Sequence, residues 1–319
     1  MTKRKILFLS SNSPVSTGSY RIWVKDLSFY FAQLGVSCKI GTEKDIPNYD
    51  IIIYSKGSSP KKIPKKIVGL INPEAGMVYN VDFIITGSIE EKDSLSVNKN
   101  VFIFPLIEKL FELKQTKVHE DKDVIRLGFH GHYPHLSKFE PNLKLALEEF
   151  SKDKKIELLL IHGTPSFNWQ YGKPKIKTLF KSWNYNNIVD QLYSCDIGLC
   201  PNATPIKDYP LNYSMDRGLY KTDYAIRFKN KSNAGRAFVF HQLGIPVIAD
   251  LTPSHMHILG NPDNGYIAMS KNGWLEALEC LSCHKHRQFI ADNARKEFNR
   301  LYNPLDWAQK LYTSITKIK

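Results

Sequence analysis

The residues best suited to chemistry stand together in the segment "KSNAGRAFVFHQLGIPVIAD" (231–250). A lysine, a serine, an asparagine and an arginine crowd the start of a segment that otherwise reads as a buried helix. A helix start presents unpaired backbone N–H groups and the positive end of the helix dipole, which favour anions. Lys231 adds a point charge, and Arg236 adds a planar fork that can hold two phosphate oxygens. We predict a phosphate site here, with Ser232 and Asn233 as helix caps or further donors.

A second polar loop, "STGSYR" (16–21), follows the apolar segment "KILFLSS", which we predict to be the first strand. The loop joins that strand to an amphipathic helix that ends at Gly35. Ligands of strand–helix folds bind at the carboxyl ends of the strands, where this loop lies. We predict that Gly18 and Ser19 offer backbone N–H groups there and that Arg21 faces an anion. The alternative is a tight turn without a ligand.

A third loop, "HGHYPH" (130–135), follows the predicted strand "VIRLGFHG". We predict that His130, Gly131 and His132 contact a ligand at this edge, and the alternative is ordinary loop polarity. Two histidines on one face of an extended segment would also suit a metal. No carboxylate stands at ligand spacing nearby, so we expect no metal and no cofactor.

The composition indicates a soluble globular protein of 319 residues, with 42% hydrophobic and 24% charged residues and room for two domains. No apolar run approaches the roughly 18 residues of a membrane span. We read the start of the chain as a strand rather than a signal peptide. The five cysteines show no framework spacing, which suits the cytoplasm. "CLSCH" (280–284) matches a haem-attachment pattern, but we predict that Cys280 and Cys283 face the core of one helical stretch.

The formal net charge of +13 favours acidic partners. The lysine run "PKKIPKK" (60–66) would suit phosphates or lipid headgroups, so an anionic membrane surface is a candidate partner. Nucleic acid is not expected, because the lysines are spread through both halves and no nucleic-acid-binding motif is present. The remaining alternative is that these lysines cover solvated faces only.

Strand-like and helix-like segments alternate twice along the chain, and the strands are continuously apolar. This pattern predicts an α/β fold of two Rossmann-like, doubly wound parallel domains that face each other across a cleft. We place an N-terminal domain at 1–118, a second domain at 119–300, and a C-terminal helix at 301–319 that packs back towards the first domain. The long tyrosine-rich stretch 203–230 is expected to be functional or mobile.

The order of motifs resembles that of GT-B glycosyltransferases of bacterial surface-polysaccharide biosynthesis. The second half carries "GFHGHYPHL", "CDIGLCP", the opening segment and "NGW..AL", and the first half carries "SPVSTGSYRIW". The resemblance implies that the first domain binds an acceptor and the second an activated sugar donor. The donor-binding residues that it implies are Gly18, Ser19, Arg21, His130, Gly131, His132, Pro201, Ser232 and Asn233.

One departure from the family concerns two glutamates, eight residues apart, that many retaining members carry. Counted back from Gly244, Lys231 and Val239 stand at those places. The glutamate that normally meets the donor is therefore absent, and a cation stands nearby. This difference keeps two alternatives open: a donor such as phosphoribosyl diphosphate, and a GT-B-like binding protein without catalysis.

The implied reaction moves a sugar from a diphosphate to a glycan or a lipid-linked glycan, at the inner face of the cell membrane. Lys231 and Arg236 would stabilise the charge that grows on the leaving diphosphate. All ten histidines lie at or beyond residue 119, so an inverting reaction, which needs a general base, would use a carboxylate of the first domain, Glu74 or Asp26. The resemblance favours a retaining, metal-independent reaction in which the leaving phosphate takes the acceptor proton.

Overall fold

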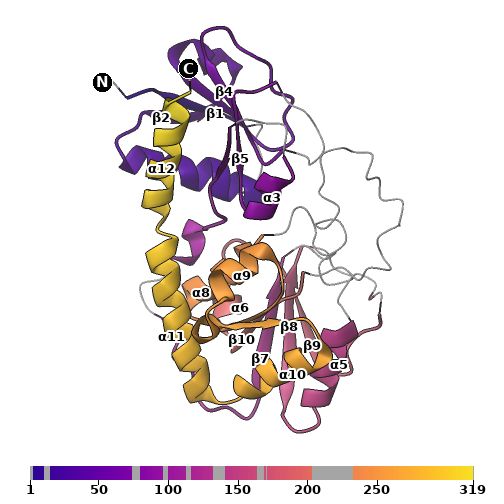
Figure 1. Ribbon diagram of the computed structural model, residues 1–319. Helices are drawn as coiled ribbons and strands as arrows, with labels where there is room; N and C mark the ends of the chain where they lie inside the picture. The colour runs from indigo at the N-terminus through magenta and orange to yellow at the C-terminus, as the bar shows by residue number, and fades with distance from the viewer. Residues whose placement is uncertain are drawn as a thin grey trace. The chain divides into compact units, whose positions relative to one another are not determined.

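The computed structural model (Figure 1) divides into two compact units. The first is built from Met1–Lys109 and Tyr302–Lys319, and the second from the described residues between Leu110 and Leu301. Four predicted site residues and the tyrosine-rich stretch lie outside the described residues: Glu74, His132, Lys231, Ser232 and 203–230. The structure describes residues 3–10, 15–73, 80–95, 100–112, 116–131, 141–163, 169, 171–202 and 233–318.

The first unit contains a six-stranded parallel sheet in the order β2-β1-β3-β4-β5-β6. Both faces of its central strands are covered, which is why these strands are apolar along their whole length. The prediction of a parallel sheet is confirmed. The strands are β1 (Ile6–Leu9), β2 (Cys38–Gly41), β3 (Ile51–Tyr54), β4 (Ile67–Ile71), β5 (Phe83–Thr86) and β6 (Val101–Ile103).

A continuous helical segment follows the β1 loop and ends where Gly35 takes a φ of +70°, as predicted for its C-cap. The last helix of the chain also belongs to this unit, because its apolar face completes the core beneath the sheet. There Phe31 and Tyr312 meet edge to face, with ring centroids 6.0 Å apart. The elements are α1 (Gly18–Tyr20), η1 (Arg21–Asp26), α2 (Leu27–Gln33), η2 (Glu43–Asn48), α3 (Ile89–Asp93) and α12 (Pro304–Thr316); η3 (Lys109–Phe111) lies at the boundary.

The second unit contains another six-stranded parallel sheet, in the order β12-β11-β10-β7-β8-β9. Its edge strand β9 was not predicted. The sequence "KTLFKS" carries two lysines and is largely exposed, so it lacks the continuous apolar pattern of the other strands. The other strands coincide with predicted apolar segments. The strands are β7 (Ile125–His130), β8 (Ile156–His162), β9 (Lys177–Ser182), β10 (Ile197–Cys200), β11 (Val247–Asp250) and β12 (Tyr266–Ala268).

The single helical stretch predicted around Cys280 and Cys283 is interrupted between these two residues. Arg287 is almost fully buried, and its Nη1 donates to the carbonyls of Leu281 (2.9 Å) and Ser282 (2.8 Å), which fixes a turn there. Cys280 and Cys283 flank that turn and are exposed, so the prediction that they face the core is wrong. The helices are α5 (Pro141–Phe150), α6 (Ile188–Tyr193), α8 (Gly235–Leu243), α9 (Pro253–Leu259), η6 (Pro262–Asn264), α10 (Lys271–Cys280) and α11 (His284–Leu301).

Candidate functional site

The second sheet has its topological switch point between β7 and β10. From β7 the chain continues to β8 on one side, while β10, β11 and β12 lie on the other. Ligands of open parallel sheets bind in the crevice at the carboxyl ends of the strands at such a point. His130 and Gly131 stand at the end of β7, and Pro201 and Asn202 follow β10. The pairing of β7 with β10 therefore brings the start of the third predicted loop close to Pro201, another predicted donor contact.

Arg236, in the first turn of α8, reaches into this switch point. Its Nη2 donates to the carbonyl of Pro201 at 3.0 Å and lies 3.4 Å from Oδ1 of Asn202. The guanidinium carbon lies 5.2 Å from the centroid of the Phe129 ring, which is a cation–π distance. Burial lowers the pKa of Arg236, although an arginine in a protein stays protonated. The side chain is therefore a fixed cation on a prearranged support.

The cationic end of Arg236 is incompletely satisfied. Its Nη1 is buried and, among the residues that the structure describes, has no hydrogen-bond partner. No ion pair between described residues includes Arg236, and the nearby carboxylate of Asp250 accepts the backbone N–H of Asn202 instead. A buried charge without an anion is costly. An anionic ligand at this point would lower that cost, as predicted for Arg236 from its sequence.

Gly131, Asn233 and His130 form the immediate surroundings of Arg236 and of the helix start that carries it. Gly131 has a φ of +127°, and a Cβ there would lie 3.3 Å from Cδ of Arg236. Oδ1 of Asn233 accepts the backbone N–H of Gly235 at 3.2 Å, a local turn that orients the start of α8. His130 is 7% exposed and stands edge-on to the Phe240 ring, with centroids 5.2 Å apart. These residues shape the switch point from the end of β7 and from the start of α8.

The structure adds two buried histidines that the sequence did not single out. His255 lies in the first turn of α9, and its Nδ1 lies 2.8 Å from the carbonyl oxygen of Asp250, so this nitrogen carries the proton. Burial, together with the charge of Arg236, lowers the pKa of His255 to about 4. Burial also lowers the pKa of His241, in α8, to about 3. Both rings are neutral at pH 7, so neither histidine adds a positive charge to that of Arg236.

At the first unit, the loop after β1 is built around Arg21. This side chain is 6% exposed, and Nε and Nη2 donate to Oε2 of Glu108 at 2.9 and 2.7 Å. Its Nη1 donates to the carbonyls of Val15 (2.7 Å) and Ser16 (3.0 Å). Arg21 was predicted to face an anionic ligand, but the structure directs its guanidinium to Glu108 and to the loop. Its role in the structure is to hold the loop.

That loop leads into the helix start predicted to offer backbone donors. Gly18 and Ser19 form the first turn of α1 and are half-buried. N–H groups of a first helical turn have no partner within the helix. Asp26, the alternative base, is 8% exposed, and burial raises its pKa to about 6. Its Oδ2 accepts the backbone N–H of Lys109 at 3.0 Å, so the carboxyl of this η1 residue holds the start of η3.

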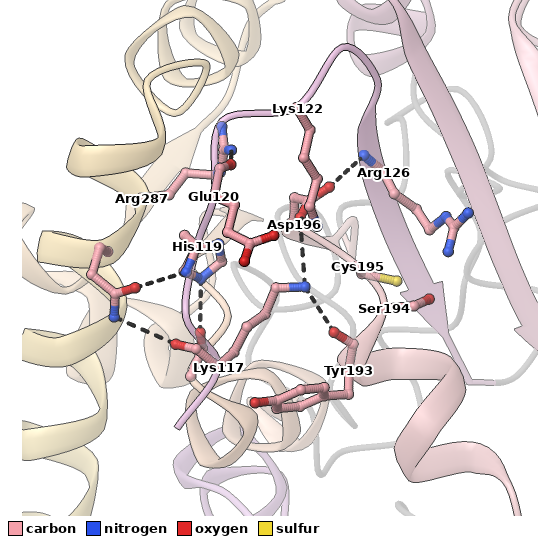
Figure 2. Close-up of polar contacts among 12 residues, drawn as sticks. Lys117, His119, Glu120, Lys122, Arg126, Tyr193, Ser194, Cys195, Asp196 and Arg287 are labelled. Atoms are coloured by element: carbon pink, nitrogen blue, oxygen red, sulfur yellow. Dashed lines mark hydrogen bonds and ion pairs between the residues drawn. The ribbon is translucent and has the colours of Figure 1, made fainter. Parts of the chain in front are cut away.

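Figure 2 shows a second charged cluster, at the amino edge of the second sheet, where Asp196 precedes β10. Its carboxylate lies 3.0 Å from Nζ of Lys122 and 3.5 Å from Nζ of Lys117, and accepts the Arg126 backbone N–H at 2.9 Å. Burial favours the protonated acid, but these contacts outweigh it and lower the pKa of Asp196. Lys117 also donates to the carbonyl of Tyr193 at 2.7 Å.

The Asp196 cluster anchors the segment that enters the second unit. Burial lowers the pKa of His119 to about 4, and its Nε2 lies 2.9 Å from the carbonyl of Gly244. Lys117, on the same segment, is 4% exposed. These contacts tie residues 117–122 to the second unit, which includes the chain from Leu110 onwards; the sequence prediction placed the domain boundary at residue 119. The charged composition of the segment suggested a solvated linker and gave no signal of this anchor.

The described residues contain no group of three or more histidine, cysteine, aspartate or glutamate side chains that could hold a metal ion. Among the described helices, none has the length and apolar character that crossing a bilayer requires.

No protein-family model matches the sequence, and no curated protein matches it. Solved structures do match its fold. HepE of Anabaena, in complex with UDP and glucose, is 10% identical with a TM-score of 0.62, over 98% of this chain and 100% of that one. Sucrose-phosphate synthase of Thermosynechococcus elongatus is 12% identical with a TM-score of 0.65, over 99% of both chains. WaaG, a glycosyltransferase involved in lipopolysaccharide biosynthesis, is 12% identical with a TM-score of 0.59, over 98% and 99%.

These similarities extend over nearly the whole chain, and each of the two units contains the parallel six-stranded sheet expected from the sequence. The protein therefore has the GT-B fold, and that prediction is confirmed.

Proposed function

We propose that this protein is a glycosyltransferase that moves a sugar from a diphosphate-activated donor to a glycan or a lipid-linked glycan. The observation that carries the proposal is the buried guanidinium of Arg236 at the switch point, which forms no ion pair among the described residues. The HepE structures contain UDP, UDP-glucose, or UDP with glucose, and they support a nucleotide sugar as the donor.

The chemistry of the transfer requires a cation at that place. When the bond between the sugar and the diphosphate breaks, its electron pair stays with the phosphate oxygen, whose negative charge grows. Nη1 of Arg236 would donate to that oxygen, while Pro201 and Phe129 hold the rest of the side chain. Because these supports are already in place, little reorganisation is needed as the charge develops.

The other roles follow from the sequence. In this proposal Lys231, Ser232 and Asn233 join Arg236 at the donor phosphates, together with His130, Gly131, His132 and Pro201. Gly18 and Ser19 offer backbone donors in the first unit, and Arg21 positions their loop. Glu74 is the candidate general base for an inverting transfer, whereas in a retaining transfer the leaving phosphate would take the acceptor proton. We propose a retaining reaction without a metal, in polysaccharide synthesis, by a cytoplasmic protein peripheral to the inner face of the membrane.

A different donor is the second candidate. Lys231 and Val239 stand where many retaining members carry glutamates, which favours a donor with more phosphate charge, such as phosphoribosyl diphosphate. The third candidate is a GT-B-like binding protein that retains the ligand and lacks turnover.

Thermal unfolding with a panel of nucleotides, nucleotide sugars and phosphoribosyl diphosphate tests these candidates. A ligand at a hundred times its Kd stabilises the folded state by about 2.7 kcal/mol. Arg236→Gln is expected to abolish that shift and to lower kcat/KM by about a hundredfold. Arg300→Gln removes the same charge from an exposed Arg300–Glu297 pair in the same unit and is expected to change neither.

Each outcome separates the candidates. A shift with one nucleoside diphosphate sugar supports the first, and a shift with phosphoribosyl diphosphate alone supports the second. A shift without transfer to any glycan supports the binding protein. A folded Arg236→Gln variant with normal thermal shifts and normal turnover would show that Arg236 does not bind the donor.

A further inference from the structure

The first unit contains a pocket of about 800 Å³ that the proposed reaction does not use. Four cationic and two acidic residues line it, together with four apolar ones. The loop between β3 and β4, which contains the lysine run singled out in the sequence, forms one wall, and the ends of the chain contribute to the other. The cations are Arg4, Lys62, Lys65 and Lys66, the acids are Asp50 and Asp82, and the apolar residues are Ile63, Pro64, Ile67 and Ile318.

The topology places this pocket at the amino edge of the first sheet. Asp50 immediately precedes β3, Lys66 precedes β4 and Asp82 precedes β5. All strands of this sheet run parallel, so these residues share one edge. The loop of Gly18 follows β1 and therefore lies at the opposite, carboxyl edge. The pocket is thus separate from the part of the first unit assigned to the reaction.

The two acids of the pocket are occupied by backbone groups. Oδ2 of Asp50 accepts the N–H of Lys5 at 2.8 Å, and Oδ2 of Asp82 accepts the N–H of Val68 at 2.8 Å. Each bond ties a strand start to its neighbour. The acids therefore serve the sheet, and they offset only part of the charge of the cations around them.

The cations divide into two that build the wall and two at the rim. Nζ of Lys66 donates to the carbonyls of Pro47 and Tyr49, and Nη1 of Arg4 donates to the carbonyl of Ile318 at 3.2 Å. In contrast, the Lys62 side chain is 63% exposed and its Nζ lies 3.9 Å from Asp82.

Lys65 is the second rim lysine. It is exposed and has a φ of +62°, in the left-handed region that residues other than glycine rarely adopt. The tight turn of this loop therefore presents two lysine side chains beside an apolar floor.

We propose that this pocket binds a phosphate ester, either the headgroup of an anionic lipid or a soluble phosphorylated compound. Four cationic side chains against two carboxylates give the pocket an excess of positive charge, which attracts an anion. The apolar residues offer contact to the less polar part of such a ligand. This site is distinct from the switch point, and it stands whether or not Arg236 binds a sugar donor.

Sedimentation with vesicles tests the lipid source. The vesicles contain phosphatidylcholine alone or phosphatidylcholine with phosphatidylglycerol, at low salt. Wild type is expected to bind the anionic vesicles, and Lys62→Gln/Lys65→Gln to bind them about thirtyfold more weakly, since each lysine near such a surface contributes about fivefold. The matched control, Lys25→Gln/Lys92→Gln, removes two exposed charges of the same unit outside the pocket. The control is expected to bind the anionic vesicles at most about threefold more weakly than wild type. Its two charges lie outside the pocket, and salt screens their attraction to the surface.

Calorimetric titration with glycerol 3-phosphate and with pyrophosphate tests the soluble source. Loss of either titration in the pocket variant but not in the control supports a soluble ligand, and selective loss of vesicle binding supports a lipid. If the two variants behave equally in every assay, or if wild type binds none of these probes, the proposal that this pocket binds a phosphate ester is wrong. Arg236→Gln should keep pocket binding, and the pocket variant should keep its thermal shift with the sugar donor. Failure of one site is therefore distinguishable from failure of the other.

Discussion

Two arginines near the carboxyl edges of the two sheets, Arg21 and Arg236, received the same prediction and have different surroundings. Arg21 meets Glu108 through two nitrogens and the loop carbonyls through a third. Among the described residues, Arg236 contacts a carbonyl, an amide and an aromatic ring and forms no ion pair, although the nearby charge of Asp250 acts to raise its pKa. The difference teaches that the counter-charge, rather than the residue type or its place in the topology, separates an arginine that supports a loop from one that can bind an anion.

The largest expected effect is that of acid on the surroundings of Arg236. Burial keeps His241 and His255 neutral with pKa values of about 3 and about 4, against 6.5 in an unfolded chain. The unfolded state binds more protons between these values, so stability falls as the pH falls from about 6.5 towards 4. From pH 7 to pH 5 each histidine is expected to cost about 2 kcal/mol. Urea unfolding at the two pH values measures the total change, to which His119, whose pKa is also lowered to about 4, adds in the same sense.

A variant isolates one of these contributions. His255→Gln can still donate to the Asp250 carbonyl but does not titrate, so its stability is expected to fall by about 2 kcal/mol less than that of wild type over the same range. Asp26 in the first unit responds in the opposite sense. Its pKa is raised to about 6, so its contribution is present at low pH and lost as the pH rises through 6. Identical pH profiles for wild type and His255→Gln would contradict the neutral buried histidine.

The next effect is that of removing the counter-charge from Arg21. Glu108→Gln leaves a buried guanidinium without its anion, which is expected to cost about 3 kcal/mol of unfolding free energy. The variant makes the first arginine resemble the second. Urea unfolding measures the loss.

A double-mutant cycle provides its control. Arg21→Gln/Glu108→Gln removes both charges and should lose clearly less than the sum of the two single variants. Additive losses would mean that the pair is not coupled, and the contrast between the two arginines would disappear.

The smallest effect concerns the glycine beside Arg236. Gly131→Ala places a Cβ 3.3 Å from Cδ of Arg236 and strains a backbone with a φ of +127°. The strain is expected to cost about 1 kcal/mol. Gly57→Ala is the matched control, because Gly57 has a φ of +81° with no heavy atom within 4 Å of the added Cβ. Both variants should lose stability, but only Gly131→Ala should weaken the thermal shift with the sugar donor. Equal shifts would mean that the backbone at Gly131 does not position Arg236.

The sequence predicted most of the strands because continuously apolar segments leave little choice once both faces of a sheet are covered. It failed at β9, an edge strand whose exposed lysines break the apolar pattern. It also failed at the turn between α10 and α11, which is stabilised by Arg287 through hydrogen bonds to carbonyls. A single buried arginine that ends a helix leaves no periodic signal in the sequence.

For the candidate site, the sequence identified Arg236 and its neighbourhood but could not supply the partners. Glu108 lies 87 residues from Arg21, and Asp196 lies more than 70 from both of its lysines. Contacts at such separations depend on strand order, which residue spacing alone does not encode. This is why Arg21, which pairs with Glu108, and Arg236, for which the described part of the chain supplies no ion pair, looked alike in the sequence.

Because α12, at the end of the chain, belongs to the first unit, it affects how the protein folds during its synthesis on the ribosome. Ala308, Leu311 and Ile315 of α12 are buried in the core of a sheet whose strands are synthesised before residue 104. The second unit, in contrast, has its last helix by Leu301. Domains commonly mature in the order of their synthesis. Here the unit that emerges first must wait with part of its apolar face uncovered, and it is completed only after the unit that emerges second.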